Sequence, residues 1–200
     1  KEASMRYLKL AYSNTSGRNN TGRITSFHRG GGYFKKYRMI NWGPMLRNVY
    51  AYVIKREYDP FREAPIDLIY YENGFYSYHI GINGLKLGFS LLGGRFVPLF
   101  LGNSLPLFRM PVGSFVSQVD SKYGRSAGTR CQILKHVGNR TVIKLPSGEK
   151  KIVLSKKWGR YGRIGRVYSR FEKVLKAGDI RKKGWRPVVR GVAMNPIDHP

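Results

Sequence analysis

Short strand-like runs separated by turn residues constrain this chain more than any other feature. Two pairs of runs rich in β-branched and aromatic residues each flank a tight-turn sequence: 66–71 and 75–80 around Asn73-Gly74, and 140–145 and 150–154 around Pro146-Ser147-Gly148-Glu149. Asn-Gly between such runs is the strongest short hairpin signal, and proline with glycine suits the second turn. The sequence therefore predicts two β-hairpins.

Similar runs recur along most of the chain, at 51–56, 112–119 and 131–134. Many short strands at regular spacing indicate small barrels rather than one large sandwich. We therefore expect a mainly β fold, with an oligonucleotide-binding-type barrel near 45–108 and a second small barrel near 109–180.

Four segments do not fit this strand pattern. Residues 102–111 are interpreted as a connector between the two barrels. Residues 168–176 alone have a helical pattern, which Gly178 would end. Residues 1–44 and 186–200 contain too few apolar residues to order alone, so we expect extended basic arms that fold against a partner.

The charge of the chain is large and unevenly distributed. Lysine and arginine number 37 against 11 aspartate and glutamate, a net +26 with histidine neutral. Residues 1–56 carry a net +11 (12 basic, 1 acidic) and 121–200 a net +17 (21 basic, 4 acidic), whereas 57–120 carry −2 (4 basic, 6 acidic). Such an excess repels itself in a compact monomer and favours a polyanionic partner. A nucleic acid is the expected partner; a membrane surface is the alternative, weakened because no long basic amphipathic helix is present.

Composition excludes several other classes of protein. With Cys131 as its one cysteine, the chain cannot form an intrachain disulfide or a cysteine-rich zinc site. Its four histidines are far apart and lack carboxylate or cysteine companions at ligand spacing, so no metal site is expected. The longest charge-free stretches, 73–85 and 96–108, fall short of the ~18 apolar residues that a membrane helix needs. No secretory signal is expected at the basic start of the chain.

Two glycine-containing sequences near the N-terminus are typical of phosphate contacts. Residues 17–23 lack the Lys-Ser/Thr of a nucleotide-hydrolase loop, but their Arg, Asn and Thr side chains suit sugar–phosphate groups. Residues 28–32 end in three glycines, whose backbone amides can approach a phosphate closely; a flexible linker is the alternative. Neighbouring cations interleave with aromatic rings, which favours RNA because cations neutralise phosphates and rings stack on bases. The cations are Arg23, Arg29, Lys35, Lys36 and Arg38, and the rings are Phe27, Tyr33, Phe34 and Tyr37.

One acid–base pair invites a catalytic interpretation. His199 follows Asp198, as in a general-base pair. Adjacent side chains on an extended backbone point to opposite sides, so no dyad is expected. An enzyme acting on RNA through these two residues stays an alternative to a structural RNA-binding protein. A free single-strand-binding module built on the first barrel is another, disfavoured by the net −2 of residues 57–120.

From residue 17 to the last residue, a series of motifs follows the order of one known family. The motifs are 17–25 (GRNNTGRIT), 28–32 (HRGGG), 57–60 (EYDP), 71–74 (YENG), 84–88 (GLKLG), 102–107 (GNSLPL), 111–113 (PVG), 125–129 (RSAGT), 145–149 (LPSGE) and, most specific, 186–200 (RPVVRGVAMNPIDHP). Together they resemble the family of the second universal protein of the large ribosomal subunit.

The resemblance implies a fold, a role and a set of contacts. It makes the second barrel SH3-like and divides the chain into a basic arm (1–44), an oligonucleotide-binding-type barrel (45–108), an SH3-like barrel (109–185) and a C-terminal extension (186–200). It implies binding to large-subunit rRNA near the peptidyl transferase centre, beside neighbouring ribosomal proteins, and a part in assembly, subunit joining and translation. The rRNA-contact residues predicted from the resemblance and from the basic arm are Arg18, Asn19, Asn20, Arg23, His28, Arg29, Gly30, Gly31, Gly32, Lys35, Lys36, Arg38, Arg125, Ser126, Arg186, Arg190, Asn195 and His199.

The same resemblance limits the chemistry expected of the chain. It connects His199 to peptide transfer, a reaction that RNA performs, so no enzymatic activity is expected. No cofactor and no small-molecule substrate are expected either, beyond Mg ions held by the bound rRNA.

The chain departs from the family pattern at several places. The family usually carries basic residues where Phe27, Tyr33 and Phe34 stand, and a longer glycine-rich loop where residues 121–124 stand. The family also continues past His199-Pro200 into a glycine-rich segment and a basic tail, so the C-terminal extension is expected to be truncated. The high usage of tyrosine (14) and phenylalanine (10) favours an AT-biased genome and a mitochondrial ribosome. A bacterial cytoplasm or a plastid is the alternative location.

Overall fold

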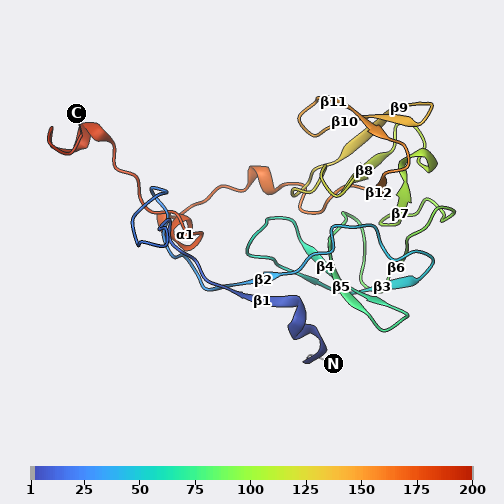
Figure 1. The fold of residues 1–200 in the computed structure, drawn as a ribbon, viewed down its shortest axis with the longest axis horizontal. Helices are drawn as coiled ribbons and strands as arrows, with labels where there is room; N and C mark the ends of the chain where they lie inside the picture. The colour runs from blue at the N-terminus through green and yellow to red at the C-terminus, as the bar shows by residue number, and fades with distance from the viewer. Residues whose placement is uncertain (1–2, 200) are drawn as a thin grey trace. The chain divides into compact units, whose positions relative to one another are not determined.

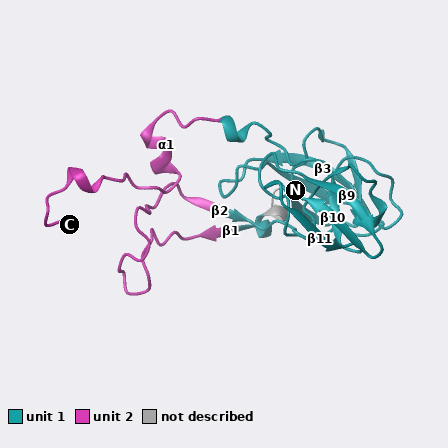
Figure 2. Cartoon of the chain, turned by 90° about the horizontal axis from the view of Figure 1, so that it is seen from above, with its two compact units in different colours: residues 1–10, 37–171 teal, residues 11–36, 172–200 magenta. Residues whose placement is uncertain are grey.

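The computed structural model describes residues 3–199, which fall into two compact units interleaved in sequence. The first unit comprises the described part of residues 1–10 together with 37–171, and the second comprises 11–36 together with 172–200 (Figure 2). In this division residues 37–44 group with the first unit and 172–185 with the second. The domain boundaries expected at 44/45 and 185/186 stay predictions.

The first sheet of the first unit has four antiparallel strands in the order β5-β4-β3-β6 (Figure 1). They are β3 (Tyr50–Glu57), β4 (Ile66–Tyr71), β5 (Tyr76–Ile80) and β6 (Ser90–Leu92). β4 and β5 pair from Ile66 with Ile80 to Tyr70 with Tyr76, and Gly74 takes a left-handed φ of +90° in the turn. The first predicted hairpin is therefore confirmed.

The second sheet of the first unit has six strands in the order β11-β10-β9-β8-β12-β7. They are β7 (Ser104–Pro106), β8 (Phe115–Ser117), β9 (Cys131–Val137), β10 (Arg140–Lys144), β11 (Lys150–Leu154) and β12 (Trp158–Tyr161). β10 and β11 pair from Arg140 with Leu154 to Lys144 with Lys150, which confirms the second predicted hairpin. Each sheet has its own apolar core, around Leu68 and Ile69 in the first and around Ile133 and Ile143 in the second. The expected mainly β fold with two small β domains is confirmed.

The structure corrects the interpretation of residues 102–111 as a plain connector. They contain β7, which pairs with β12, and the 3-10 helix η2 (Leu107–Arg109). Pro106 ends β7 at the edge of the sheet, where the missing N–H of proline costs no ladder hydrogen bond.

The helix predicted at 168–176 is wrong. This segment contains a single 3-10 turn, η3 (Ser169–Phe171), and the α-helix α1 (Ala177–Lys182) begins later, with Gly178 inside it. Tyr168, Phe171 and Leu175 have the spacing of a helical face, but all three are exposed. Because short helices depend on packing of their apolar face, a face without a partner does not hold the segment helical.

Within the first unit, Arg160 connects the two sheets. Its side chain is only 2% exposed, and its guanidinium donates hydrogen bonds to the carbonyl oxygens of Ile80 (3.0 Å) and Gly102 (3.2 Å). Ile80 ends β5 in the first sheet, whereas Arg160 lies on β12 in the second. A bridge between Ile82 and Ile164 adds a backbone link between the same regions.

The second unit has no buried residue among those that the structure describes. It holds α1 and the 3-10 helix η4 (Gly191–Ala193). β1 (Lys9–Tyr12), which follows the 3-10 helix η1 (Ala3–Leu8), pairs with β2 (Lys35–Arg38), and both strands run across the boundary between the units. No helix in the described part of the chain has the length and apolarity needed to span a bilayer.

Candidate nucleic-acid interface

The loop at 17–25 is closed by its own polar groups. The carbonyl oxygen of Gly17 accepts the N–H of Thr25 at 2.9 Å. Oδ1 of Asn19 accepts the N–H of Arg23 at 3.1 Å and two further hydrogen bonds from within the loop. Asn19 therefore shapes the loop with its acceptor oxygen, and the exposed side chains of Asn20 and Arg23 stand on it.

Asn14 ties this loop to the triple glycine, Gly30 to Gly32. Its Nδ2 donates to the carbonyl oxygens of Gly30 (3.1 Å) and Gly31 (2.9 Å), and its Oδ1 accepts the N–H of Ser16 at 3.0 Å. The guanidinium of Arg18 in turn donates to the carbonyl oxygen of Ser16 at 2.6 Å. The two predicted phosphate-binding motifs therefore form one continuous hydrogen-bonded segment.

The N-terminal segment 28–33 pairs with the C-terminal segment 182–186, and we call this pairing the arm junction. Its backbone hydrogen bonds run from the N–H of Gly30 to Gly184 (2.9 Å), from Arg186 to His28 (3.0 Å) and from Tyr33 to Lys182 (3.1 Å). The arm junction brings the His28-Arg29 motif and Arg186 together although more than 150 residues separate them in sequence.

Two cations of the arm junction lie over aromatic rings. The guanidinium carbon of Arg29 is 3.7 Å from the ring centroid of Trp185, and Nζ of Lys182 is 5.7 Å from that of Tyr33. A hydrogen bond to Tyr33 is the main cause that raises the pKa of Lys182. The rings of Trp185 and Tyr33 therefore hold these two cations in place.

The three glycines differ in what they do. Gly32 has a left-handed φ of +64°, and a Cβ on it would lie 2.8 Å from the carbonyl oxygen of Lys182. A Cβ on Gly30 would lie 3.3 Å from Cγ of Arg186. Gly31 has no left-handed φ, and its nearest neighbour would be Oγ of Ser16 at 3.7 Å. Gly32 is thus needed for packing at the arm junction. Of the three glycines, only Gly31 could carry a Cβ without close contact to another atom of the unit.

The C-terminal residues 187–199 lead away from α1 in both views (Figures 1 and 2). Their turn is local: the N–H groups of Asp198 and His199 both point to the carbonyl oxygen of Asn195, at 2.9 and 3.2 Å. The ring of His199 packs on Gly191, where a Cβ would collide with it. Arg190, Asn195 and His199 are exposed, and the structure does not bring them to the arm junction.

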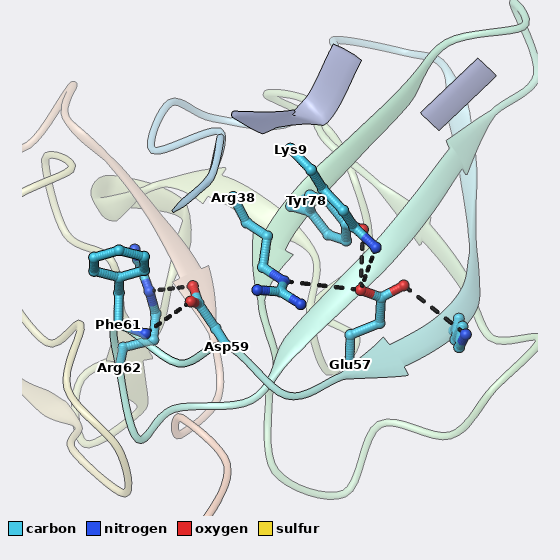
Figure 3. A network of polar contacts seen from close by, with 8 residues as sticks. Lys9, Arg38, Glu57, Asp59, Phe61, Arg62 and Tyr78 are labelled. Atoms are coloured by element: carbon cyan, nitrogen blue, oxygen red, sulfur yellow. Dashed lines mark hydrogen bonds and ion pairs between the residues drawn. The ribbon is translucent and has the colours of Figure 1, made fainter. Parts of the chain in front are cut away.

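Arg38, predicted as an RNA contact, lies in the first unit within an ion-pair network (Figure 3). Oε2 of Glu57 is 3.1 Å from Nζ of Lys9 and 3.9 Å from Nε of Arg38, and it accepts the hydroxyl of Tyr78 at 3.1 Å. Burial opposes ionisation of Glu57, but the hydrogen bond and charge of Lys9 outweigh it and lower its pKa. The charge of Arg38 is therefore shared with a carboxylate, unlike that of Arg23.

Arg125 and Ser126, like Arg38, lie in the first unit. Arg125 has its guanidinium carbon 4.6 Å from the ring centroid of Trp42, which Arg62 also faces at 5.2 Å. The carbonyl oxygen of Ser126 accepts the N–H and hydroxyl of Thr129 at 3.1 and 2.7 Å. Both residues are exposed and lie in the segment between β8 and β9.

The second unit is rich in cations. Its two segments contain 12 Lys and Arg against 3 Asp and Glu. Because none of its described residues is buried, the unit has backbone groups and cations at its surface rather than a core. Such a surface suits a phosphate backbone, which can fix the register of exposed cations and amides. Among the described residues no cluster of His, Cys, Asp and Glu has the composition to hold a metal ion.

The sequence did not reveal four residues that shape the second unit: Asn14, which bonds to the triple glycine, and Lys182, Gly184 and Trp185 of the arm junction. Nothing in the sequence distinguishes Asn14 from the other polar residues of the N-terminal arm. Trp185 lies one residue before the expected C-terminal extension, 186–200. A tryptophan among cations at 181–186 was the available signal, because cation–π pairs favour such neighbours.

Comparison with known proteins gives matches over nearly the whole chain. The family model "Ribosomal Proteins L2, RNA binding N-terminal domain" matches residues 5–93, and "Ribosomal Proteins L2, C-terminal domain" matches residues 101–200. The chain is 39% identical over 199 residues to the large ribosomal subunit protein uL2 of Wigglesworthia glossinidia brevipalpis, covering 96% of this chain and 72% of that protein. These matches include both sheets of the first unit and both segments of the second.

Proposed function

Because this chain belongs to the uL2 family of large-subunit ribosomal proteins, we propose that it is a structural, RNA-binding constituent of a large ribosomal subunit. The family and the fold class, an oligonucleotide-binding-type barrel followed by an SH3-like barrel, are those predicted from the sequence, and both predictions are confirmed. The observation that carries the proposal is the second unit, in which residues 11–36 and 172–199 form one cation-rich surface and none of these residues is buried.

The finer role rests on the resemblance of the motifs. We propose that the second unit binds large-subunit rRNA near the peptidyl transferase centre and supports assembly, subunit joining and translation. Exposed side chains such as Asn20, Arg23 and Arg190 would contact phosphates, with the amides around Gly31 approaching the backbone closely. Arg125 and Ser126 would make a separate contact from the first unit. Neighbouring ribosomal proteins would be further partners.

The chain itself is proposed to perform no reaction. His199 is exposed, its ring lies on Gly191, and no hydrogen bond joins it to Asp198 in the described structure. A general base needs a partner that orients its ring, and this pair lacks that geometry. We also propose that the chain holds no cofactor and no small-molecule substrate, and that any Mg ions at the interface belong to the bound rRNA.

The high content of tyrosine and phenylalanine supports a mitochondrial ribosome as the location. Fractionation of the source cells tests this part separately: the chain should sediment with the large subunit of the organelle. Sedimentation with a bacterial or plastid large subunit would replace the location and leave the molecular role unchanged.

The salt dependence of RNA binding tests the role of the second unit. Affinity of the full chain for large-subunit rRNA should fall steeply with salt, and Arg23→Gln should reduce the slope of log affinity against log salt by ~0.7–0.9 for one lost phosphate contact. Lys86→Gln is the matched control, since Lys86 is an exposed cation on the first barrel. A nearly flat salt dependence, or equal slopes for both variants, would contradict the proposed interface.

A further inference from the structure

The SH3-like barrel carries a groove that the predicted contacts do not explain. It has a volume of about 380 Å³, which lies within the range of ligand sites, roughly 300–1,000 Å³. Its walls come from the start of β8, the beginning of β9, the end of β10 and the segment 163–171, all within the first unit.

Charge in this groove has a single sign. Four cations line it, and none of its lining residues is an aspartate or glutamate. The cations are Arg130, Lys144, Arg163 and Arg170. An adjoining hollow shares Ala127, Thr129, Pro146 and Arg170 with the groove, and Glu63 lines that hollow but not the groove. The lining of the groove itself therefore favours an anionic ligand.

Part of the groove wall is held in place before any ligand arrives. Nε of Arg163 donates to the carbonyl oxygen of Gly128 at 2.7 Å, and the N–H of Gly128 donates to Gly165 at 2.9 Å. A Cβ on Gly128 would lie 2.8 Å from Cα of Val167, so the two backbone segments touch. The guanidinium of Arg163 is thus fixed relative to the segment that carries the aromatic rings.

Two aromatic rings of the groove are unusually exposed. Tyr168, which precedes the 3-10 turn η3, and Phe171, the last residue of that turn, are each 76% exposed, although large rings normally bury most of their surface. Phe115 lies at the other side with the guanidinium carbon of Arg130 at 3.8 Å from its ring centroid. Exposed rings beside cations, in a groove lined by no carboxylate, can bind a ligand that has both a flat apolar face and negative charge.

We propose that this groove binds an unpaired segment of RNA, with a base stacked on Tyr168 or Phe171 and the adjacent phosphates held by Arg163 and Arg170. A duplex would not suit it, because base faces are accessible only where bases are unstacked. This inference rests on the proposed function in one respect, that RNA is the partner of the chain. It adds a site outside the predicted contacts and the kind of RNA that the site selects.

Removing the rings while keeping the cations tests the stacking. The double variant Tyr168→Ala/Phe171→Ala of the full chain should bind a single-stranded RNA oligonucleotide ~10-fold more weakly, since one stacked base contributes on the order of 1–3 kcal/mol. Its affinity for a duplex of equal length should change less than about twofold, because duplex binding is electrostatic. The matched control is Tyr58→Ala/Phe75→Ala, which removes rings of 70% and 65% exposure from the first barrel and should leave both affinities unchanged.

The outcomes separate the two proposals. An equal loss of affinity for single-stranded and duplex RNA, or no loss at all, would overturn the proposed RNA site in the groove and leave the ribosomal role intact. A wild-type chain that binds neither RNA would instead overturn the proposed function. Thermal unfolding of each variant should match the wild type, since all four rings are exposed.

Cross-linking in the assembled particle identifies what occupies the groove. A photoreactive phenylalanine analogue at position 171 should form an adduct with rRNA at an unpaired nucleotide. An adduct with another protein, or with a base-paired nucleotide, would refute the proposed occupant, and so would the absence of any adduct.

Discussion

Gly32→Ala tests whether the arm junction is the structure on which RNA binding depends. The variant adds one methyl group at a residue with φ +64°, where it would lie 2.8 Å from the carbonyl oxygen of Lys182 and 3.0 Å from the nitrogen of Gly184. Both neighbours are backbone atoms, so no side-chain rotation relieves the contact. The backbone at 182–184 must move away, and it carries the acceptor for the N–H of Tyr33.

The expected cost follows from these contacts. A residue with a Cβ costs ~1–2 kcal/mol in the left-handed region. Loss of the hydrogen bond from Tyr33 to Lys182 adds ~0.5–1.5 kcal/mol. Together they destabilise the arm junction by ~1.5–3.5 kcal/mol, which corresponds to roughly 10- to 400-fold more frequent opening. The first unit shares none of these contacts, so its melting should not change.

Gly22→Ala is the matched control for this variant. Gly22 also has a left-handed φ, +78°, but a Cβ on it would have no neighbour within 4 Å. Amide hydrogen exchange on the reconstituted subunit should show faster exchange at Gly30, Tyr33 and Arg186 in Gly32→Ala and wild-type rates there in Gly22→Ala. Unchanged exchange in Gly32→Ala, or an equal effect of the control, would refute the packing role of Gly32.

Three further predictions concern the glycine surface, the order of the arms and pH. Gly31→Val should reduce incorporation into large subunits several-fold while the melting of the first unit stays unchanged, because nothing in the free chain crowds position 31; normal incorporation would leave Gly31 as a linker residue. Residues 13–36 and 186–199 should be cut by proteases in the free chain and protected in the subunit, since no described residue of the second unit is buried. Residues 37–44 should resist cleavage in both states, because Ile40 is buried and the N–H of Asn41 donates to the carbonyl oxygen of Tyr78. Equal cleavage of the arms in both states would show that RNA does not order them. Burial, together with the nearby charge of Arg160, lowers the pKa of His79 well below its ordinary value. Below pH ~6.5 the unfolded chain therefore binds a proton that the folded chain does not. The free energy of unfolding should fall by up to ~1.4 kcal/mol per pH unit as the pH falls. Urea unfolding of wild type and His79→Gln between about pH 7.5 and 5.5 measures this, and equal pH dependence in both would contradict it.

Local chemistry made much of the fold predictable. The hairpins at Asn73-Gly74 and Pro146-Ser147-Gly148-Glu149 depend on turn residues next to the strands that they join, so neighbours in sequence carried the information. The charge imbalance and the ordered motifs likewise predicted the family. The individual RNA contacts stay predictions, although the structure shows which of their side chains are exposed and which, like Asn19, already have partners within the chain.

Long-range pairing was decided only by the tertiary structure. The local pattern at 168–176 does not show whether its apolar face packs against another part of the chain. In the structure the apolar side chains of this face are exposed. Arg160 was one cation among many until the fold placed two carbonyl oxygens around it. The arm junction joins residues about 150 positions apart through backbone groups, which every residue possesses and which leave no trace in composition or periodicity. The sequence by itself thus determined the two hairpins, their turns and the charge, while the tertiary structure decided which distant segments satisfy each other's hydrogen bonds.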